Sequence, residues 1–401
     1  MMTSNSILLK NFNTIISANE QGLIKDNKSY LYLEDEIIKS YDYRPSQIEI
    51  DCKGKMITPG FVDPHTHPVF LNTRHDEFLM RLKGIPYEQI AINGGGIVST
   101  IDSINKSSEE NIIDNLMFKM DEFIRFGTTT IEAKSGYGLS VDGELKSLSC
   151  LESVNKNHAI DIIPTFMGAH AFPKTYLDNP NEYVDIICNE MIPKVSDQGI
   201  AIFNDVFCEK GYFGIDQTRK IIECGNSFGL KPRLHVDEFD DIGGIELAIE
   251  VGAVSVDHLM ASNSRSIDLL SKSNVIATLL PGTSFFLNLD DYAPAREIID
   301  KGVSVALATD YNPGSSHMKN MSFIILLSTM KLKMSIEEAF VACTYNAAKS
   351  LQLEDSIGSI SIGKKADLII WDIETLEEIP YYFMDAPIQK VIKNGKIAFE
   401  A

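Results

Sequence analysis

The sequence predicts an α/β fold: a (β/α)8 barrel of the TIM type with a small β-sandwich domain formed from both termini. Two observations lead to this prediction. In the middle of the chain, short apolar runs typical of strands alternate eight times with segments of helical length, which indicates a parallel sheet closed into a barrel. At both ends, strand-like runs follow one another without helices between them.

The barrel is expected to occupy residues 59–355. The helical segments between its strands include IDQTRKIIECGNSFG, where Gly229 followed by Pro232 is a pattern that ends helices. The eight runs expected to form the strands are GFVDPHTH, TTTIEAKSG, IDIIPTFMGAH, IAIFNDVFCE, KPRLHVDE, AVSVDHL, NVIATLLPG and VSVALATD.

The small domain is expected to combine residues 1–58 with residues 356–401. SILLKNF and SYLYLED near the N-terminus, and KADLIIWD and KVIKNGKIAFE near the C-terminus, are rich in apolar and β-branched residues. Asn394-Gly395 between two such runs is a strong signal for a two-residue hairpin turn. Both termini are therefore predicted to contribute strands to one domain.

Composition narrows the class of protein and of partner. The chain has 401 residues, of which 44% are hydrophobic, enough for one large domain with a deep core. The formal net charge of −20 at pH 7 disfavours nucleic acid and anionic membrane as partners, because the surface repels them. A small anionic substrate remains compatible, since a local pocket can oppose the overall field.

The chain shows no sign of secretion. Its first residues, MMTSNSILLKNFNTI, lack a basic start followed by a long apolar run, and stretches such as 322–327 are too short to span a bilayer. The six cysteines form no CxxC pair, so they favour free thiols over a zinc knuckle or a disulfide framework. We therefore expect a cytoplasmic protein.

Histidines gather at predicted strand ends. Five of the eight lie there, and the C-terminal ends of barrel strands are where such folds carry their chemistry. A single histidine on a strand is more often a hydrogen-bonded structural residue, but five at one end of a barrel favour a functional site. These five are His65, His67, His170, His235 and His258.

The spacing of these residues predicts a metal site. Because residues i and i+2 of a strand point to the same side, His65 and His67 can both face one ion. His235 and Asp310, from the fifth and eighth strands, can complete a shell of three nitrogens and one oxygen. Imidazole and carboxylate suit Zn²⁺ or Fe²⁺ with a position left for water, whose pKa such an ion lowers from 15.7 to about 7.

Beyond these residues, PGFVDPHTH and SIGSISIGKKADLIIWD resemble signatures of the amidohydrolase superfamily. Within that superfamily the chain resembles the imidazolonepropionase family over nearly the whole barrel. The motifs that carry this resemblance are GGGIVST at 94–100, KSGYGL at 134–139, TFMGAHAFP at 165–173, DVFCEKGYF at 205–213, HVDEF at 235–239, VDHL at 256–259, LLPGTSFFL at 279–287, YAPAR at 292–296 and ATDYNPGSS at 308–316.

The resemblance implies a reaction and a cofactor. Water would open the ring of 4-imidazolone-5-propanoate at its cyclic amide bond and yield N-formimidoyl-L-glutamate, a step of histidine degradation. It also implies a cytoplasmic homodimer that uses Zn²⁺ or iron, as Fe²⁺ or Fe³⁺, with one ion per chain. The expected partners are this small-molecule substrate and a second copy of the chain.

The resemblance also assigns roles residue by residue. It implies His65, His67, His235 and Asp310 as metal ligands. Arg74 matches the arginine that binds the substrate's propionate, a contact suited to a guanidinium because it can bind a carboxylate with two hydrogen bonds. The other positions that match substrate-binding residues are Tyr137, His170, Glu238, Asn312, Gly314 and Ser315.

Glu238 and His258 are the candidates for proton handling. A carboxylate at 238, three residues after the ligand His235, can accept a proton from the attacking water and pass it to the departing ring nitrogen. His258 can donate a hydrogen bond to the carbonyl oxygen as negative charge develops on it. The sequence leaves open which of the two is the first general base, and Asp310 can share the role.

Some amidohydrolases bridge two metals with a carboxylated lysine on the fourth strand. Lys134 instead follows the predicted second strand, so the sequence favours a single metal and leaves Lys134 structural or substrate-facing. Two other functions remain alternatives: a deaminase of a purine, pyrimidine or related ring, and a barrel that lost catalysis and serves in assembly. Arg74, with the KSGYG and NPGSS blocks, disfavours the first alternative, and the full set of predicted ligands with both proton-handling candidates disfavours the second.

Overall fold

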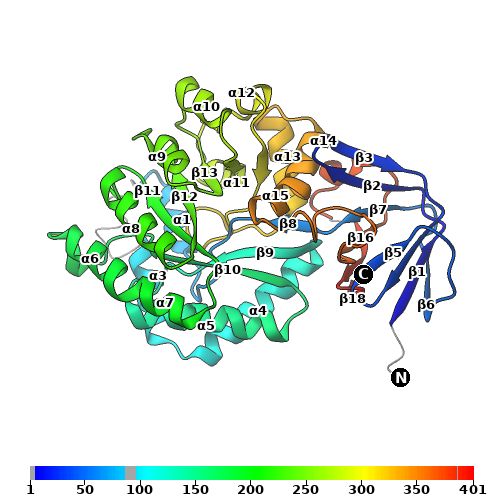
Figure 1. The fold of residues 1–401 in the computed structure, drawn as a ribbon, viewed down its shortest axis with the longest axis horizontal. Helices are drawn as coiled ribbons and strands as arrows, with labels where there is room; N and C mark the ends of the chain where they lie inside the picture. The colour runs from blue at the N-terminus through cyan, green and yellow to red at the C-terminus, as the bar shows by residue number, and fades with distance from the viewer. Residues whose placement is uncertain (1–4, 86–95, 386) are drawn as a thin grey trace.

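The computed structural model describes residues 5–85, 96–385 and 387–401. The first two residues of the GGGIVST motif, Gly94 and Gly95, lie outside the described residues. Eight parallel strands form one sheet whose order along the sheet follows the chain from first to last (Figure 1). They are β8 (Phe61–Asp63), β9 (Thr128–Lys134), β10 (Asp161–Ala169), β11 (Phe203–Cys208), β12 (Lys231–Val236), β13 (Ser255–His258), β14 (Ile276–Leu279) and β15 (Val305–Leu307).

The sheet closes between its first and last strands. The backbone N–H of Thr309 donates to Asp63 Oδ1 at 3.1 Å, and the Asp310 N–H donates to the carbonyl oxygen of His65 at 3.1 Å. Thr66 forms a parallel bridge with Tyr311. These contacts join the residues that follow β8 and β15, so the two chain segments that carry predicted metal ligands lie side by side.

Helices surround the barrel, as Figure 1 shows, and bury its outer face. β8 is followed by α1 (His75–Leu82), α3 (Ile97–Lys106) and α4 (Glu109–Arg125), and β9 by α5 (Val141–Asn157). After β10 come η1 (Lys174–Tyr176), α6 (Pro180–Ile186), η2 (Ile187–Met191) and α7 (Ile192–Gln198). The remaining helices are α8 (Ile215–Ser227), α9 (Gly244–Glu250), α10 (Ser264–Leu270), α11 (Pro281–Phe286), α12 (Ala295–Asp300), α13 (Met321–Lys331), α14 (Ile336–Ala342), α15 (Tyr345–Ser350) and α16 (Glu378–Tyr381).

Two further sheets lie beside the barrel. The four-stranded sheet has the order β5-β4-β1-β6, and the six-stranded sheet β18-β17-β16-β7-β2-β3. Figure 1 shows N-terminal strands in blue beside C-terminal strands in orange and red. Their bounds are β1 (Ser6–Lys10), β2 (Thr14–Asn19), β3 (Gly22–Asp26), β4 (Tyr30–Glu34), β5 (Ile37–Ser40), β6 (Ile48–Asp51), β7 (Met56–Pro59), β16 (Leu368–Trp371), β17 (Ile388–Lys393) and β18 (Lys396–Glu400).

The apolar run of β16 explains how this strand of the six-stranded sheet is buried on both faces. Leu368 and Ile370 pack in a core shared with strands of the four-stranded sheet, while Ile369 and Trp371 pack in the barrel core. Alternate strand residues point to opposite faces, so a continuously apolar strand contributes to two cores. The predicted barrel and the sheet structure assembled from both termini are therefore confirmed.

Local signals also match the structure. Asn394 and Gly395 have φ values of 48° and 68° and join β17 to β18, as the predicted hairpin requires. The six cysteines are free thiols. In the part of the chain that the structure describes, no helix has the length and apolar character needed to cross a bilayer.

Candidate metal centre and active-site cavity

Three imidazoles and one carboxylate meet at the carboxyl end of the barrel. The Nε2 atom of His67 lies 3.3 Å from the Nε2 atoms of both His65 and His235. Asp310 Oδ1 lies 3.6 Å from Nε2 of His65 and from Nε2 of His67. All four side chains are buried. The predicted ligands from three separate strands are thus brought together.

The separations of these atoms fit a metal ion. Four ligands placed tetrahedrally at a Zn–N distance of about 2.1 Å lie about 3.4 Å from one another. Within this set, the distances from His67 Nε2 to the other two imidazoles are 3.3 Å, and those from Asp310 Oδ1 to His65 and His67 are 3.6 Å. Such a set of neutral nitrogens and one carboxylate oxygen suits a divalent transition metal.

Carboxylates behind two of the imidazoles fix how the rings are held. His65 Nδ1 lies 2.7 Å from Asp257 Oδ2, and His235 Nδ1 lies 3.0 Å from Asp205 Oδ1. An Nδ1–H that donates to a carboxylate leaves the Nε2 lone pair for an ion. Burial lowers the pKa of His65 and of His67 well below the ordinary value, so these rings stay neutral and able to bind metal.

Asp310 is oriented by its own surroundings. The Thr283 hydroxyl donates to Asp310 Oδ2 at 2.6 Å, which leaves Oδ1 facing the imidazoles. The residue has φ of 53°, a backbone conformation that most L-residues avoid. Burial raises the pKa of this carboxyl to about 6, since the charged form has lost its water.

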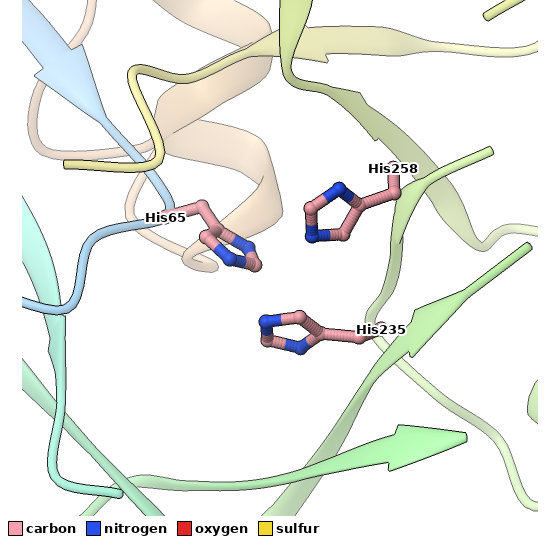
Figure 2. Close-up of side chains that lie close together, drawn as sticks. All are labelled: His65, His235 and His258. Carbon is pink, nitrogen blue, oxygen red and sulfur yellow. The ribbon is translucent and has the colours of Figure 1, made fainter. Parts of the chain in front are cut away.

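Glu238 and His258 lie beside this group, and Figure 2 shows the rings of His65, His235 and His258 directed toward one another. His258 Nε2 is 3.6 Å from Glu238 Oε2. The ligand atoms of the three histidines also lie within 4.8 Å of one another, so His258 is close enough to serve as an alternative ligand. Its φ of 87° places it among the strained residues at these strand ends.

A cavity of about 390 Å³ opens above the metal candidates. It brings together every residue that the sequence analysis assigned to substrate binding, proton handling or metal binding, except His65, which lies beneath. The predicted residues that line the cavity are His67, Arg74, Tyr137, His170, His235, Glu238, His258, Asp310, Asn312, Gly314 and Ser315.

Arg74 reaches this cavity across a glycine. A Cβ atom placed on Gly314 would lie 2.4 Å from Arg74 Nη1, so the guanidinium approaches the backbone more closely than any side chain at 314 allows. Glu77 anchors the guanidinium from behind, with Glu77 Oε2 2.8 Å from both Nε and Nη2. The arginine is therefore held in one orientation before a ligand binds.

His170 and Tyr137 form an adjoining wall. His170 Nδ1 lies 2.9 Å from the carbonyl oxygen of Gly136, so it carries the proton and leaves Nε2 as an acceptor. Burial lowers the pKa of His170 to about 3, which keeps the ring neutral. The ring stacks on His67 with centroids 4.9 Å apart and lies 5.2 Å from the Tyr137 ring.

The segment after Asp310 is organised by one amide side chain. Asn312 Oδ1 accepts from the backbone N–H groups of Gly314 and Ser315 at 2.8 and 2.7 Å. Its Nδ2 donates to the Asp310 carbonyl oxygen at 2.7 Å. Asn312 thus holds Gly314 beneath Arg74 while its own amide is engaged within the loop.

Sequence reasoning missed several lining residues. Arg81 is one of them; it lies on α1 seven residues, about two helical turns, after Arg74, which is the N-cap of that helix. That periodicity was the available signal. The other lining residues are far apart in the chain, and although all but Leu289 lie in motifs quoted above, no short stretch of sequence shows that their loops meet. These additional residues are Ile97, Phe207, Tyr212, Phe239, Leu287 and Leu289.

Comparison with solved structures supports the architecture. The chain matches the structure of guanine deaminase from E. coli with a TM-score of 0.76 at 16% identity, covering 100% of both chains. It matches an adenosine deaminase from Xanthomonas campestris, solved with bound zinc, with a TM-score of 0.74 at 16% identity, covering 98% of this chain and 92% of that one. At this identity the likeness concerns the fold.

Comparison of sequences is more specific. Residues 219–398 match the model of the amidohydrolase family. The imidazolonepropionase of Alkaliphilus metalliredigens (strain QYMF) is 46% identical over 351 residues, which cover 88% of this chain and 83% of that protein. Identity at that level over most of both chains is enough to assign the family. The chain therefore belongs to the imidazolonepropionase family of amidohydrolases.

Proposed function

We propose that this protein hydrolyses the cyclic amide bond of 4-imidazolone-5-propanoate to N-formimidoyl-L-glutamate in histidine degradation. The observation that carries the proposal is one cavity in which an anchored guanidinium, Arg74, accompanies a buried group of imidazoles and a carboxylate. The first feature suits a carboxylate tail and the second suits metal-assisted hydrolysis. Membership of the imidazolonepropionase family supports the same reaction.

His65, His67, His235 and Asp310 are the proposed ligands of one Zn²⁺ or iron ion. When bound, the ion supplies a Lewis acid that makes water nucleophilic near neutral pH. The carboxylates of Asp257 and Asp205 hold two of the rings with Nε2 directed inward. The protein's contribution is therefore a site arranged before the ion enters.

Substrate binding is proposed to begin with its propionate. Arg74 offers its guanidinium to that carboxylate, and Gly314 leaves the space for it. Neutral His170 accepts a hydrogen bond at Nε2 from a ring N–H, and Tyr137 packs beside it. Asn312 and Ser315 complete the wall near the metal candidates. These contacts orient the cyclic amide toward the bottom of the cavity.

Glu238 and His258 are proposed to handle protons. Burial, with Asp310 and Glu209 nearby, raises the pKa of the Glu238 carboxyl well above its ordinary value. Such a group can hold the proton taken from the attacking water until it delivers it to the departing ring nitrogen. His258 donates a hydrogen bond to the carbonyl oxygen as water adds to the carbonyl carbon and negative charge develops on that oxygen.

We also propose the finer organisation that the family implies. The small domain combines residues 1–58 with 356–401, the catalytic barrel spans 59–355, and the enzyme works in the cytoplasm as a homodimer. Trp371 and Ile369, which pack the six-stranded sheet onto the barrel core, support treating the two domains as one cooperative unit. Light scattering coupled to gel filtration tests the dimer.

The test of the reaction is loss of the ultraviolet absorbance of freshly prepared imidazolonepropionate, followed with protein of measured metal content. We expect rapid loss with formimidoylglutamate as product, and strong impairment in His235→Ala and Arg74→Ala. Arg125→Ala, at an exposed arginine of α4, is the matched control and should behave as wild type. A metal-loaded protein that leaves the substrate intact contradicts the proposal, and cyclic amides and aminated rings would then be compared.

A further inference from the structure

Beneath the proposed metal centre lies a buried ion-pair chain, which we define as Glu132, Lys134 and Asp205. Lys134 Nζ lies 2.8 Å from Glu132 Oε1 and 2.8 Å from Asp205 Oδ2, and none of the three side chains is exposed. Glu132 and Lys134 are two residues apart on β9 and point to the same side of the strand. β9 contributes no proposed ligand, yet its inward side chains are charged.

Each end of the ion-pair chain contacts a segment of the polypeptide that carries imidazoles. On one side, Asp205 Oδ1 lies 3.0 Å from His235 Nδ1. On the other, Glu132 Oε2 accepts from the backbone N–H of Thr66 at 3.2 Å, and Thr66 lies between His65 and His67. The backbone N–H of Lys134 also donates to the Thr66 carbonyl oxygen at 3.0 Å. Lys134 therefore stands between the attachments of three imidazoles.

The three charged side chains of the ion-pair chain stabilise one another, because each is buried. A buried ammonium without partners is strongly unfavourable, and so is each buried carboxylate. Burial by itself lowers the pKa of Lys134, but Asp205 and Glu132 outweigh it and the pKa is raised, so the lysine stays charged. A protonated amine between two carboxylates at 2.8 Å is a bridging cation, and it is not free to face substrate.

We propose that Lys134 is a positioning residue of the metal centre: it ties Asp205 to Glu132 and so holds His235 in register with His65 and His67. It touches neither ion nor substrate. This inference rests on the proposed metal site and resolves the two sequence-based alternatives for Lys134 in favour of a structural one. Because the ion-pair chain fixes the separation of the imidazoles, we expect them to converge before the ion binds.

A second buried lysine provides a matched control. Lys393, on β17, has a side chain that is 1% exposed and lies 2.8 Å from Asp161 and 2.6 Å from Asp367. It has the same partners in kind as Lys134 but contacts no proposed ligand and no residue that holds one. Loss of Lys134 removes the ammonium between the buried Glu132 and Asp205, and loss of Lys393 removes it from the buried Asp367, while Asp161 keeps Lys365 as a partner, so both substitutions should lower stability. Only the loss of Lys134 should change the affinity for Zn²⁺.

The experiment measures Zn²⁺ affinity by competition with a chelator, and the melting temperature of the metal-free protein. The variants are Lys134→Met, Glu132→Gln, the double variant and Lys393→Met. We expect Lys134→Met to bind Zn²⁺ about 10–100-fold more weakly, the usual effect of removing a group behind a ligand. Lys393→Met should lower the melting temperature and leave Zn²⁺ affinity unchanged.

The double variant separates charge balance from positioning. It removes one cation and one anion, so a lysine that merely neutralises charge predicts recovery of Zn²⁺ affinity, whereas positioning predicts continued weakness. Affinity of Lys134→Met or of the double variant within about twofold of wild type overturns the inference. If Lys134→Met does not fold, Glu132→Gln decides, since unchanged affinity there contradicts the role of the chain. Wild-type protein that binds neither Zn²⁺ nor iron would instead contradict the proposed metal site itself.

Discussion

The carboxyl end of the barrel and the β-sandwich are both densely packed, but they bury different groups. The sandwich core consists of aliphatic side chains such as Ile57, Leu368 and Ile370. The barrel end buries imidazoles, carboxylates, Lys134 and Arg233. Burying charge contributes little net stability even when it is well paired. We infer from this difference that the barrel end is arranged to form a functional site, and that the aliphatic cores stabilise the fold around it.

Backbone strain divides the two regions in the same way. In the sandwich, positive φ values outside glycine fall on residues at turns, such as Asn11, Asp35 and Asn394. At the barrel end they fall on His258 and Asp310, where no hairpin turn requires them. Asn and Asp tolerate this conformation in turns, whereas strain in a site persists only because its surroundings impose it.

The largest effect should follow from removing an imidazole. His235→Ala deletes one of the four converging ligand side chains and removes the imidazole that contacts Asp205, so we expect kcat/KM to fall on the order of 10³-fold or more, with Zn²⁺ retention reduced. Steady-state assays together with metal analysis check this. Near-normal activity with one metal per chain would show that the ligand set is different, with His258 then the replacement to test.

A sandwich substitution should act on stability instead. Ile370→Ala removes a fully buried side chain between the two small sheets, and we expect a loss of about 2–5 kcal/mol in the free energy of unfolding. Activity per folded molecule should remain unchanged. Denaturant titration and assays on the folded fraction check this. A large fall in kcat at full folding would mean that the sandwich also shapes the site.

Gly314→Ala tests, within the site, whether Arg74 binds the substrate carboxylate. The new methyl group would meet Arg74 Nη1 and displace the guanidinium, so we expect KM to rise about 10–100-fold, with a smaller change in kcat. Gly214→Ala is the matched control, because its Cβ would meet nothing within 4 Å and its φ is −74°. Equal KM values in the two variants would argue against Arg74 as the carboxylate-binding residue.

The smallest effect concerns pH. The pKa of His170 is about 3 in the folded protein, against about 6.5 for an unfolded chain. Below pH 6.5 the unfolded state therefore binds a proton that the folded state refuses, and stability falls as pH decreases toward 3. The slope should reach on the order of 1 kcal/mol per pH unit for this group.

Melting curves of chelator-treated protein between pH 7 and pH 5 measure that slope. His170→Gln should make the dependence shallower, and substitution of the exposed His75 should leave it as in wild type. An unchanged slope in His170→Gln would indicate that this ring is more open to solvent than its packing on His67 suggests.

The sequence by itself determined the eight barrel strands, the hairpin at Asn394-Gly395 and the gathering of His65, His67 and Asp310 at strand ends. These features are local: apolar periodicity, turn chemistry and the two-residue spacing of a strand are visible in short windows. The convergence of distant strand ends also followed, because a closed parallel barrel brings all its carboxyl ends to one face.

Only the tertiary structure decided what stands behind and around these residues. Asp205 and Asp257 each support an imidazole, Gly314 leaves room for Arg74, and Lys134 lies between two carboxylates instead of facing substrate. Apart from the contact between Lys134 and Glu132, these contacts join residues far apart in the chain, across strands whose register and side-chain geometry no short window specifies. Their distances arise from how the closed barrel packs, which is why the convergence of the imidazoles and Asp310 could be predicted and the residues that support them could not.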